Sequence, residues 1–283
     1  MTKRILRATS FLLMMTLASI AIQAKEPAPS VEVDIYQSGE LYIASDNQMS
    51  DIDKTLQQAK QQGKLALIVM GANWCHDSRS LAKKLFLPKI KSVIDSNYEL
   101  LFVDVGYLSK IREVITRFDQ PVIYATPTVL IIDPKSERQL NAHNMHQWRD
   151  ADKISPANTF QYFADIAESK NQLLADLETV DNSPTPQLLR MNQSIAEFEK
   201  RHAERIYKAF TVIGPLLKEK KEGGKAEKFL QYWKAVASLR YKITDDLTAL
   251  RKQAIEIADA SRAGVSRSEV ALTFPNYPAF EWE

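Results

Sequence analysis

The sequence contains a single cysteine, Cys75, among 283 residues. A disulfide-stabilised scaffold is excluded, because such a scaffold needs cysteines in pairs. A self-contained dithiol centre is excluded for the same reason, since the second sulfur that would complete the exchange is missing. The lone thiol is therefore either a working group or an isolated buried one.

The sequence also has no apolar run after residue 24 that could cross a membrane. Residues 1–24 have a basic start, an apolar core over residues 8–22 and a small-residue end, which is the pattern of a cleaved export signal. An uncleaved anchor is the alternative, although the core is shorter than a membrane span. We expect an exported protein, periplasmic in location, with no membrane span after signal cleavage.

Neither sign of charge dominates the chain. The formal net charge is +2, and residues 1–24 carry three positive and no negative side chains, which leaves 2 − 3 = −1 for the rest. Binding to nucleic acid rests on a basic face, so we expect no nucleic-acid partner. The composition, with 45% hydrophobic and 25% charged residues, is that of an ordinary globular protein.

One stretch combines a strand, a turn and a helix around the cysteine. The apolar run Leu65–Met70 is followed by small residues and then by helical spacing at Leu81, Leu85 and Phe86. This pattern places Cys75 at a helix N-terminus, where free N–H groups and the helix dipole favour the thiolate. A cysteine in that position tends to be nucleophilic.

Two motifs in this order resemble a known family. The first has the Trp-Cys-x-x-Cys pattern of the thioredoxin active site, with serine as its last residue: Trp74-Cys75-His76-Asp77-Ser78. The second resembles the family's cis-proline loop and the strand after it: Ala125-Thr126-Pro127-Thr128 and then Val129–Ile132. The chain is therefore identified as similar to exported thioredoxin-domain proteins with a monothiol Cys-x-x-Ser motif.

The resemblance implies an α/β fold in which helices flank a central mixed sheet. It also implies that Cys75 is the nucleophile of a catalytic motif with Trp74, His76 and Ser78. Ser78 cannot resolve a mixed disulfide, because a hydroxyl does not exchange with disulfides. We expect Ser78 to donate a hydrogen bond to the Cys75 thiolate one helical turn away. His76, if protonated, would favour the thiolate, and the neighbouring Asp77 would oppose it.

The second motif implies a substrate-binding edge. In the resemblance, Thr126 and Pro127 form a loop whose cis peptide bond places backbone groups beside the nucleophile, where a bound peptide can pair as an added strand. An ordinary trans proline that opens a strand is the alternative.

The chain divides into six parts by composition and pattern. They are an export signal (1–24), a leader (25–49), a thioredoxin-like domain (50–170), a linker (171–187), a helical hairpin (188–262) and a C-terminal tail (263–283). Within the domain, Pro88 is expected to end the helix that follows Cys75. The other expected elements are helices over Asp51–Gln62, Ser109–Phe118 and Asn158–Ala167, and strands over Tyr98–Val105, Val129–Ile132 and Arg138–Asn141.

The hairpin is expected from two long helical patterns on either side of the turn Lys221–Gly224. Two helices alone bury little surface, so their apolar seam should pack on the thioredoxin-like domain or on another copy of the chain, which would make a homodimer. The tail has several aromatic residues, which suggest that it docks on another surface; the sequence does not identify that surface.

Histidines offer a weaker signal for metal binding. His143 and His146 could join Cys75 or His76 in a site of mixed nitrogen and sulfur ligands, but no second cysteine supports it. We expect no metal, and we interpret these two histidines as surface residues. His202 falls on the seam of the first long helix, where a packing role is expected.

Two functions fit these observations. The first is thiol-disulfide exchange through mixed disulfides on Cys75, in reduction, isomerisation or deglutathionylation, which would make the protein a monothiol oxidoreductase or isomerase. Its partners would be protein thiols or disulfides, with an external resolving thiol such as glutathione as co-substrate and no bound cofactor. The second is a redox-inactive module that holds a partner protein through the cis-proline groove and the hairpin. An accessible thiol favours the first function, and a buried one the second.

Overall fold

The computed structural model describes residues 40–142, 144–179, 185–262 and 271–283, so the expected export signal and most of the leader lie outside it. In order, the elements are α2 (Gln48–Gln62), β1 (Leu65–Gly71), α3 (His76–Leu85), α4 (Pro88–Asn97), β2 (Tyr98–Asp104), α5 (Arg112–Arg117), β3 (Thr128–Ile132), a 3₁₀ helix (Met145–Asp150), α6 (Pro156–Thr179), α7 (Pro186–Lys221) and α8 (Phe229–Arg262). In the part of the chain so described, no helix is long and apolar enough to cross a membrane.

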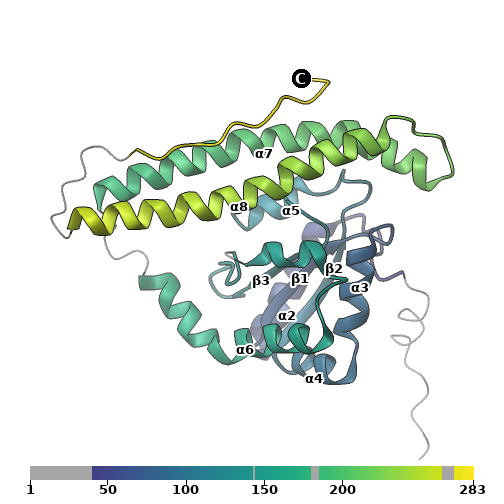
Figure 1. The fold of residues 1–283 in the computed structure, drawn as a ribbon. Helices are drawn as coiled ribbons and strands as arrows, with labels where there is room; N and C mark the ends of the chain where they lie inside the picture. Colours follow the sequence, from purple (N-terminus) through teal and green to yellow (C-terminus); the bar gives the residue numbers. More distant parts are fainter. Residues whose placement is uncertain (1–39, 143, 180–184, 263–270) are drawn as a thin grey trace, which may run out of the picture.

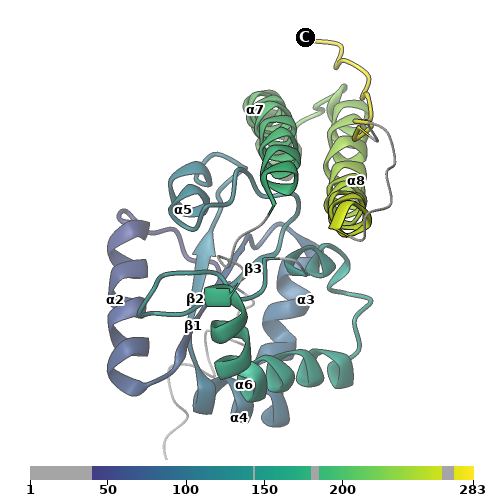
Figure 2. The same cartoon turned by 90° about the vertical axis from the view of Figure 1, so that its left-hand side faces the viewer.

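A three-stranded mixed sheet lies at the centre of the α/β domain. Its strand order is β2-β1-β3, with β2 parallel and β3 antiparallel to β1. The mixed sheet expected from the sequence is confirmed. Every residue of β1 is buried, because helices cover both faces of the sheet (Figures 1 and 2).

Alternate side chains of β1 supply two separate hydrophobic cores. Ala66, Ile68 and Met70 pack with residues of α2 and α5 on one face, whereas Leu65 and Val69 pack with residues of α3, α4 and α6 on the other. This division follows from the two-residue period of a strand. It also explains why the strand is apolar throughout its length.

The helix α4 was not expected from the sequence. Pro88 does end the helix before it, but it also begins the next one, because its fixed φ suits the first position of a helix. Ile90 and Ile94 of α4 are buried against the sheet. Similarly, α5 is shorter than the expected Ser109–Phe118, since Leu108 has a φ of 65° and Ile111 is not yet helical.

The fourth strand expected over Arg138–Asn141 is wrong, because only one isolated bridge, Ile132 to Gln139, forms there. The Asn141 side chain takes the place of a strand backbone. Its amide oxygen accepts a bond from Ile131 N at 2.9 Å, and its amide nitrogen donates to Val129 O at 2.9 Å. Together with the backbone bonds from Leu140 N to Ile131 O and from Asp133 N to Arg138 O, these bonds satisfy the edge of β3.

The expected linker begins too early, since residues 171–179 form the last turns of α6. No glycine or proline interrupts this stretch, and Leu173, Leu174 and Leu177 continue the packing of the second core. Residues 180–184, the rest of the linker pattern, lie outside the described residues. Thr185 then caps α7 by accepting a bond from Leu188 N.

The two long helices α7 and α8 run antiparallel, as expected, and lie across the α/β domain (Figures 1 and 2). Ile206, Phe210 and Ile213 of α7 belong to the same core as α2 and α5. The seam of the hairpin therefore packs on the chain's own domain, which is one of the two arrangements expected.

The described part of the C-terminal tail, residues 271–283, follows the hairpin on the side away from the α/β domain (Figure 1). Tyr277 donates to Asp246 of α8 at 2.7 Å, and Glu283 pairs with Arg205 of α7 at 2.7 Å. The expectation that the tail docks is met by contacts with both helices.

We predict that Gly214→Ala weakens the docking of the hairpin. A Cβ at this position would overlap the backbone carbonyl oxygen of Tyr107, so α7 has to move away from the loop before α5. Overpacking of this kind costs about 1–3 kcal/mol, which urea denaturation should detect. Asn192→Ala, at an exposed position of the same helix, is the control. Equal stability of both variants and the parent would contradict the close approach.

We also predict that the protein loses stability between pH 6.5 and pH 4. Burial between Phe198 and Tyr277 lowers the pKa of His202 to about 4. The unfolded chain takes up a proton near pH 6.5, whereas the folded chain does not until about pH 4, so stability is fully present above 6.5 and is lost below it.

His202→Gln should remove on the order of 1 kcal/mol from that pH dependence. Thermal denaturation at pH 7.5 and pH 5 measures the effect. An identical pH slope in the variant and the parent would show that His202 is not the group responsible.

Candidate active site around Cys75

Cys75 lies between the end of β1 and the first turn of α3, for which it is the N-cap residue. Its backbone is extended, with φ −88° and ψ 125°, and its N–H donates to Ala72 O at 3.0 Å. The side chain is half-buried. The helix N-terminus expected for this cysteine is therefore present, with free N–H groups of α3 directly after it.

The cis-proline loop faces the sulfur. The peptide bond between Thr126 and Pro127 is cis, which confirms the expected loop geometry. The Cys75 thiol donates to Thr126 O at 3.2 Å, and Thr126 Oγ1 donates to Cys75 Sγ at 3.3 Å. The two motifs of the sequence thus meet at one sulfur atom.

Ser78 does not contact Cys75 through a hydrogen bond, so the role expected for it is wrong. Its Oγ is buried and has no hydrogen-bond partner among the described residues. A Cβ on Gly71 would lie 2.7 Å from that oxygen and 2.6 Å from the Tyr42 ring, so the three residues fill one space. Thr126, rather than Ser78, supplies the hydroxyl donor to the sulfur.

Tyr42 is a neighbour of the site that the sequence did not indicate. Its hydroxyl donates to Ser78 O at 3.2 Å. Burial, and after it the charge of the Cys75 sulfur, raises the pKa of Tyr42. The tyrosine therefore stays neutral and adds no charge to the buried side of the site.

Trp74 joins the site to the hairpin. Its indole N–H donates to Gly106 O at 2.8 Å, and its ring meets Trp233 of α8 edge-on at 6.2 Å. A hollow of about 500 Å³ opens beside it. Its walls come from the α/β domain (Trp74, Cys75, His76, Asp77, Thr126 and Arg149) and from the hairpin (Leu217, Lys220, Lys221, Phe229, Leu230, Trp233, Arg240 and Tyr241).

A family described as thioredoxin-like matches residues 47–134, which contain both motifs. This part of the chain belongs to the thioredoxin-like family. Among solved structures, a disulphide isomerase from Xylella fastidiosa Temecula1 is similar at 26% identity and a TM-score of 0.42, over 44% of this chain and 95% of that one. No curated protein matches the chain.

In the thioredoxin-like domain, His76 contacts an acidic pair. Its Nδ1 lies 3.7 Å from Asp152 Oδ2, and Asp152 N donates to Asp77 Oδ1 at 3.0 Å. Burial, with the nearby Asp152, raises the pKa of Asp77. Ligand atoms of the three side chains lie within 4.8 Å of one another, but His76 is largely exposed and exposed acidic groups are common without a metal.

The other histidines differ from the expectation in part. His146 is only partly exposed: its ring meets Tyr124 edge-on at 5.2 Å, and burial lowers its pKa to about 4. His143 lies outside the described residues. His202 packs in the hairpin, as expected.

Arg240 of α8 is the residue of the site that sequence reasoning missed most clearly. Only 3% of it is exposed, and its Nε donates to Tyr124 O at 2.7 Å, two residues before Thr126. The helical pattern of residues 229–257 could have indicated Arg240. It occupies a position on the apolar seam, between Val236 and Ile243, where an apolar residue is expected. A cation there indicates a buried polar partner.

We predict that Thr126→Val slows the alkylation of Cys75 by iodoacetamide at neutral pH by roughly three- to tenfold, because it removes a hydrogen-bond donor that favours the thiolate. Thr126→Ser keeps the hydroxyl and should react nearly as fast as the parent. The rate as a function of pH, followed by mass spectrometry, is the measurement. Equal rates for the valine and serine variants would contradict this role of Thr126.

Proposed function

We propose that the protein is an exported monothiol thioredoxin-like protein, which forms mixed disulfides through Cys75 in thiol-disulfide exchange. Reduction, isomerisation and deglutathionylation all pass through such an adduct. The proposed partners are protein thiols or disulfides. The placement of the sulfur carries the proposal: it lies at the start of α3, against the cis-proline loop, and lines an open hollow.

The proposed reaction has two exchange steps. The Cys75 thiolate attacks one sulfur of a disulfide, so the S–S bond of the substrate breaks, a bond from Cys75 to that sulfur forms, and the other half leaves as a thiolate. The chain has no second cysteine to repeat the attack. An external thiolate therefore attacks the adduct, forms a new disulfide with the substrate half and releases Cys75. Glutathione is the proposed external thiol.

Export, and the periplasm as location, are supported by the pattern of residues 1–24. A disulfide-forming compartment would supply the substrates of the proposed reaction. The half-buried position of the thiol also suits this setting. A substrate disulfide can reach the sulfur through the hollow, while the buried side of the sulfur is shielded from other oxidants.

A redox-inactive binding module is the second candidate. One observation favours it: the hairpin contacts the loop of the cis-proline motif through the bond from Arg240 to Tyr124 O. In that case the groove would hold a partner and Cys75 would not react. The first function is better supported, because the thiol lines the hollow instead of lying in the core.

A simple experiment distinguishes the exchange function from the binding module. The purified protein is treated with the neutral disulfide of mercaptoethanol and examined by intact-mass spectrometry. We predict one stable adduct per chain, absent in Cys75→Ser. Failure of the parent protein to form the adduct would reject the exchange function and leave the binding module.

Ser78→Cys should change the outcome of that reaction. The introduced thiol lies one helical turn from Cys75 and can attack the adduct, so we predict that the adduct disappears and that a second equivalent of mercaptoethanol is released. Ser80→Cys places a thiol on the same helix outside that turn and should instead carry an adduct of its own. A persistent adduct in folded Ser78→Cys, checked by circular dichroism, would contradict the monothiol explanation.

A further inference from the structure

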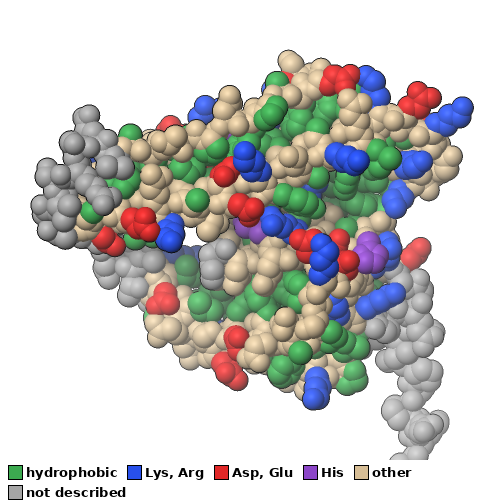
Figure 3. Space-filling view, in the orientation of Figure 1, with side chains coloured by type: hydrophobic (Ala, Val, Ile, Leu, Met, Phe, Trp, Pro, Cys, Tyr) green, Lys and Arg blue, Asp and Glu red, His purple; other side chains and the backbone are tan. Residues whose placement is uncertain are grey.

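The hollow beside Cys75 has an unequal distribution of charge. Arg240 lies in its wall, and Lys220 and Lys221 stand at the end of α7 beside it, whereas Asp77 is the carboxylate that lines it. Figure 3 shows basic and acidic side chains interspersed along the junction of the hairpin and the domain. Arg149 also lines the hollow, so four cationic side chains and one carboxylate face it.

Arg240 has no counter-charge within the described residues. Its guanidinium lies near the rings of Phe210, Trp233 and Tyr241, at 5.5 to 6.0 Å, and its Nε donates to the neutral carbonyl of Tyr124. Burial lowers the pKa of Arg240, an effect that Tyr241 and the Cys75 sulfur oppose. A buried cation without an ion pair is costly, so an anion in the hollow would be stabilising.

The dimensions of the hollow favour a small ligand over a long polypeptide. Its volume of about 500 Å³ is within the range of small-molecule sites. The hairpin forms one wall, and the bond from Arg240 to Tyr124 O uses a backbone carbonyl of the loop that leads to Thr126. The rings of Trp74 and Trp233 meet edge-on and line the same hollow as Cys75, so they give it apolar surface suited to the carbon chain of a thiol compound.

We propose that the hollow binds small disulfides and thiols that carry carboxylate groups, with Arg240 as the carboxylate-binding residue. This inference rests on the exchange reaction proposed above. Lys220 and Lys221 add positive potential at the mouth of the hollow. The carboxylate of the bound half contacts Arg240 while its sulfur bonds to Cys75, and the other half leaves as a thiolate.

Two disulfides of similar length and opposite charge test the proposal. Dithiodipropionate carries a carboxylate at each end, and cystamine an amine at each end. The rate of adduct formation on Cys75 is measured for both, and each is divided by the rate of the same disulfide with free mercaptoethanol. We expect a normalised preference of at least about tenfold for dithiodipropionate, reduced at high salt.

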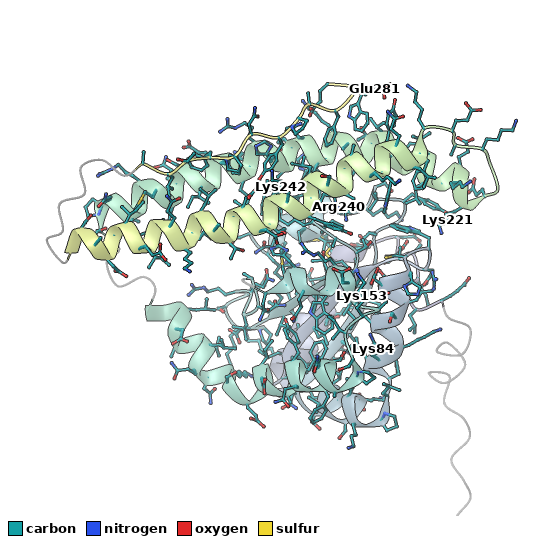
Figure 4. The ribbon with its side chains drawn as sticks, in the orientation of Figure 1. Lys84, Lys153, Lys221, Arg240, Lys242 and Glu281 are labelled. Carbon is teal, nitrogen blue, oxygen red and sulfur yellow. The ribbon has the colours of Figure 1, made fainter. Side chains whose placement is uncertain are left out.

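Substitutions of the cationic residues test which of them cause the preference for dithiodipropionate. Arg240→Gln should reduce the preference about tenfold, and Lys220→Gln combined with Lys221→Gln should reduce it by a smaller factor and weaken its salt dependence. Lys242→Gln is the matched control: it removes a cation from the same helix on the side of the tail, where Lys242 lies 5.7 Å from the Tyr277 ring (Figure 4). It should leave the preference unchanged.

The outcomes separate the two proposals. Equal normalised rates for the two disulfides would overturn the carboxylate site and leave the exchange function intact, whereas failure of both to react would overturn both. A preference that Lys242→Gln removes as fully as Arg240→Gln would also overturn the site. The two lysines are exposed, so their variant tests the charge preference independently of the stability of Arg240→Gln.

Discussion

The hydrogen bond from Arg240 to Tyr124 O joins the two halves of the molecule at the point where the chemistry is expected. It places a buried guanidinium of the hairpin against the loop that continues to Thr126, and Thr126 contacts the sulfur of Cys75. The hairpin therefore belongs to the site, because without it the thiol would face solvent on that side. The close approach of Gly214 to Tyr107 holds the same helices in position.

Most of the thioredoxin-like domain could be predicted from local sequence patterns. The strand Leu65–Met70, the turn before Cys75 and the cis-proline loop each have their signal within a few residues, and all three are found as expected. The helix that begins at Pro88 was missed because proline indicates both the end of one helix and the start of another.

The contacts of the site were harder to predict, because they depend on residues far apart in the sequence. Ser78 makes no hydrogen bond to the thiol and shares a buried space with Gly71 and Tyr42, and Tyr42 comes from a segment about thirty residues earlier in the chain. The position of Asp152 beside His76 depends on the path of the chain after β3. Arg240 reaches the cis-proline loop only in the docked hairpin.

Tyr124 is attached to both helices of the hairpin. Its carbonyl accepts from Arg240 of α8, and its hydroxyl donates to Glu199 of α7, which itself pairs with Arg251 of α8. Any displacement of the hairpin is thus transmitted to the loop that contacts the sulfur. Thermodynamic linkage makes such coupling reciprocal: a molecule whose affinity for the hairpin depends on the state of Cys75 changes the equilibrium of that thiol by the same factor.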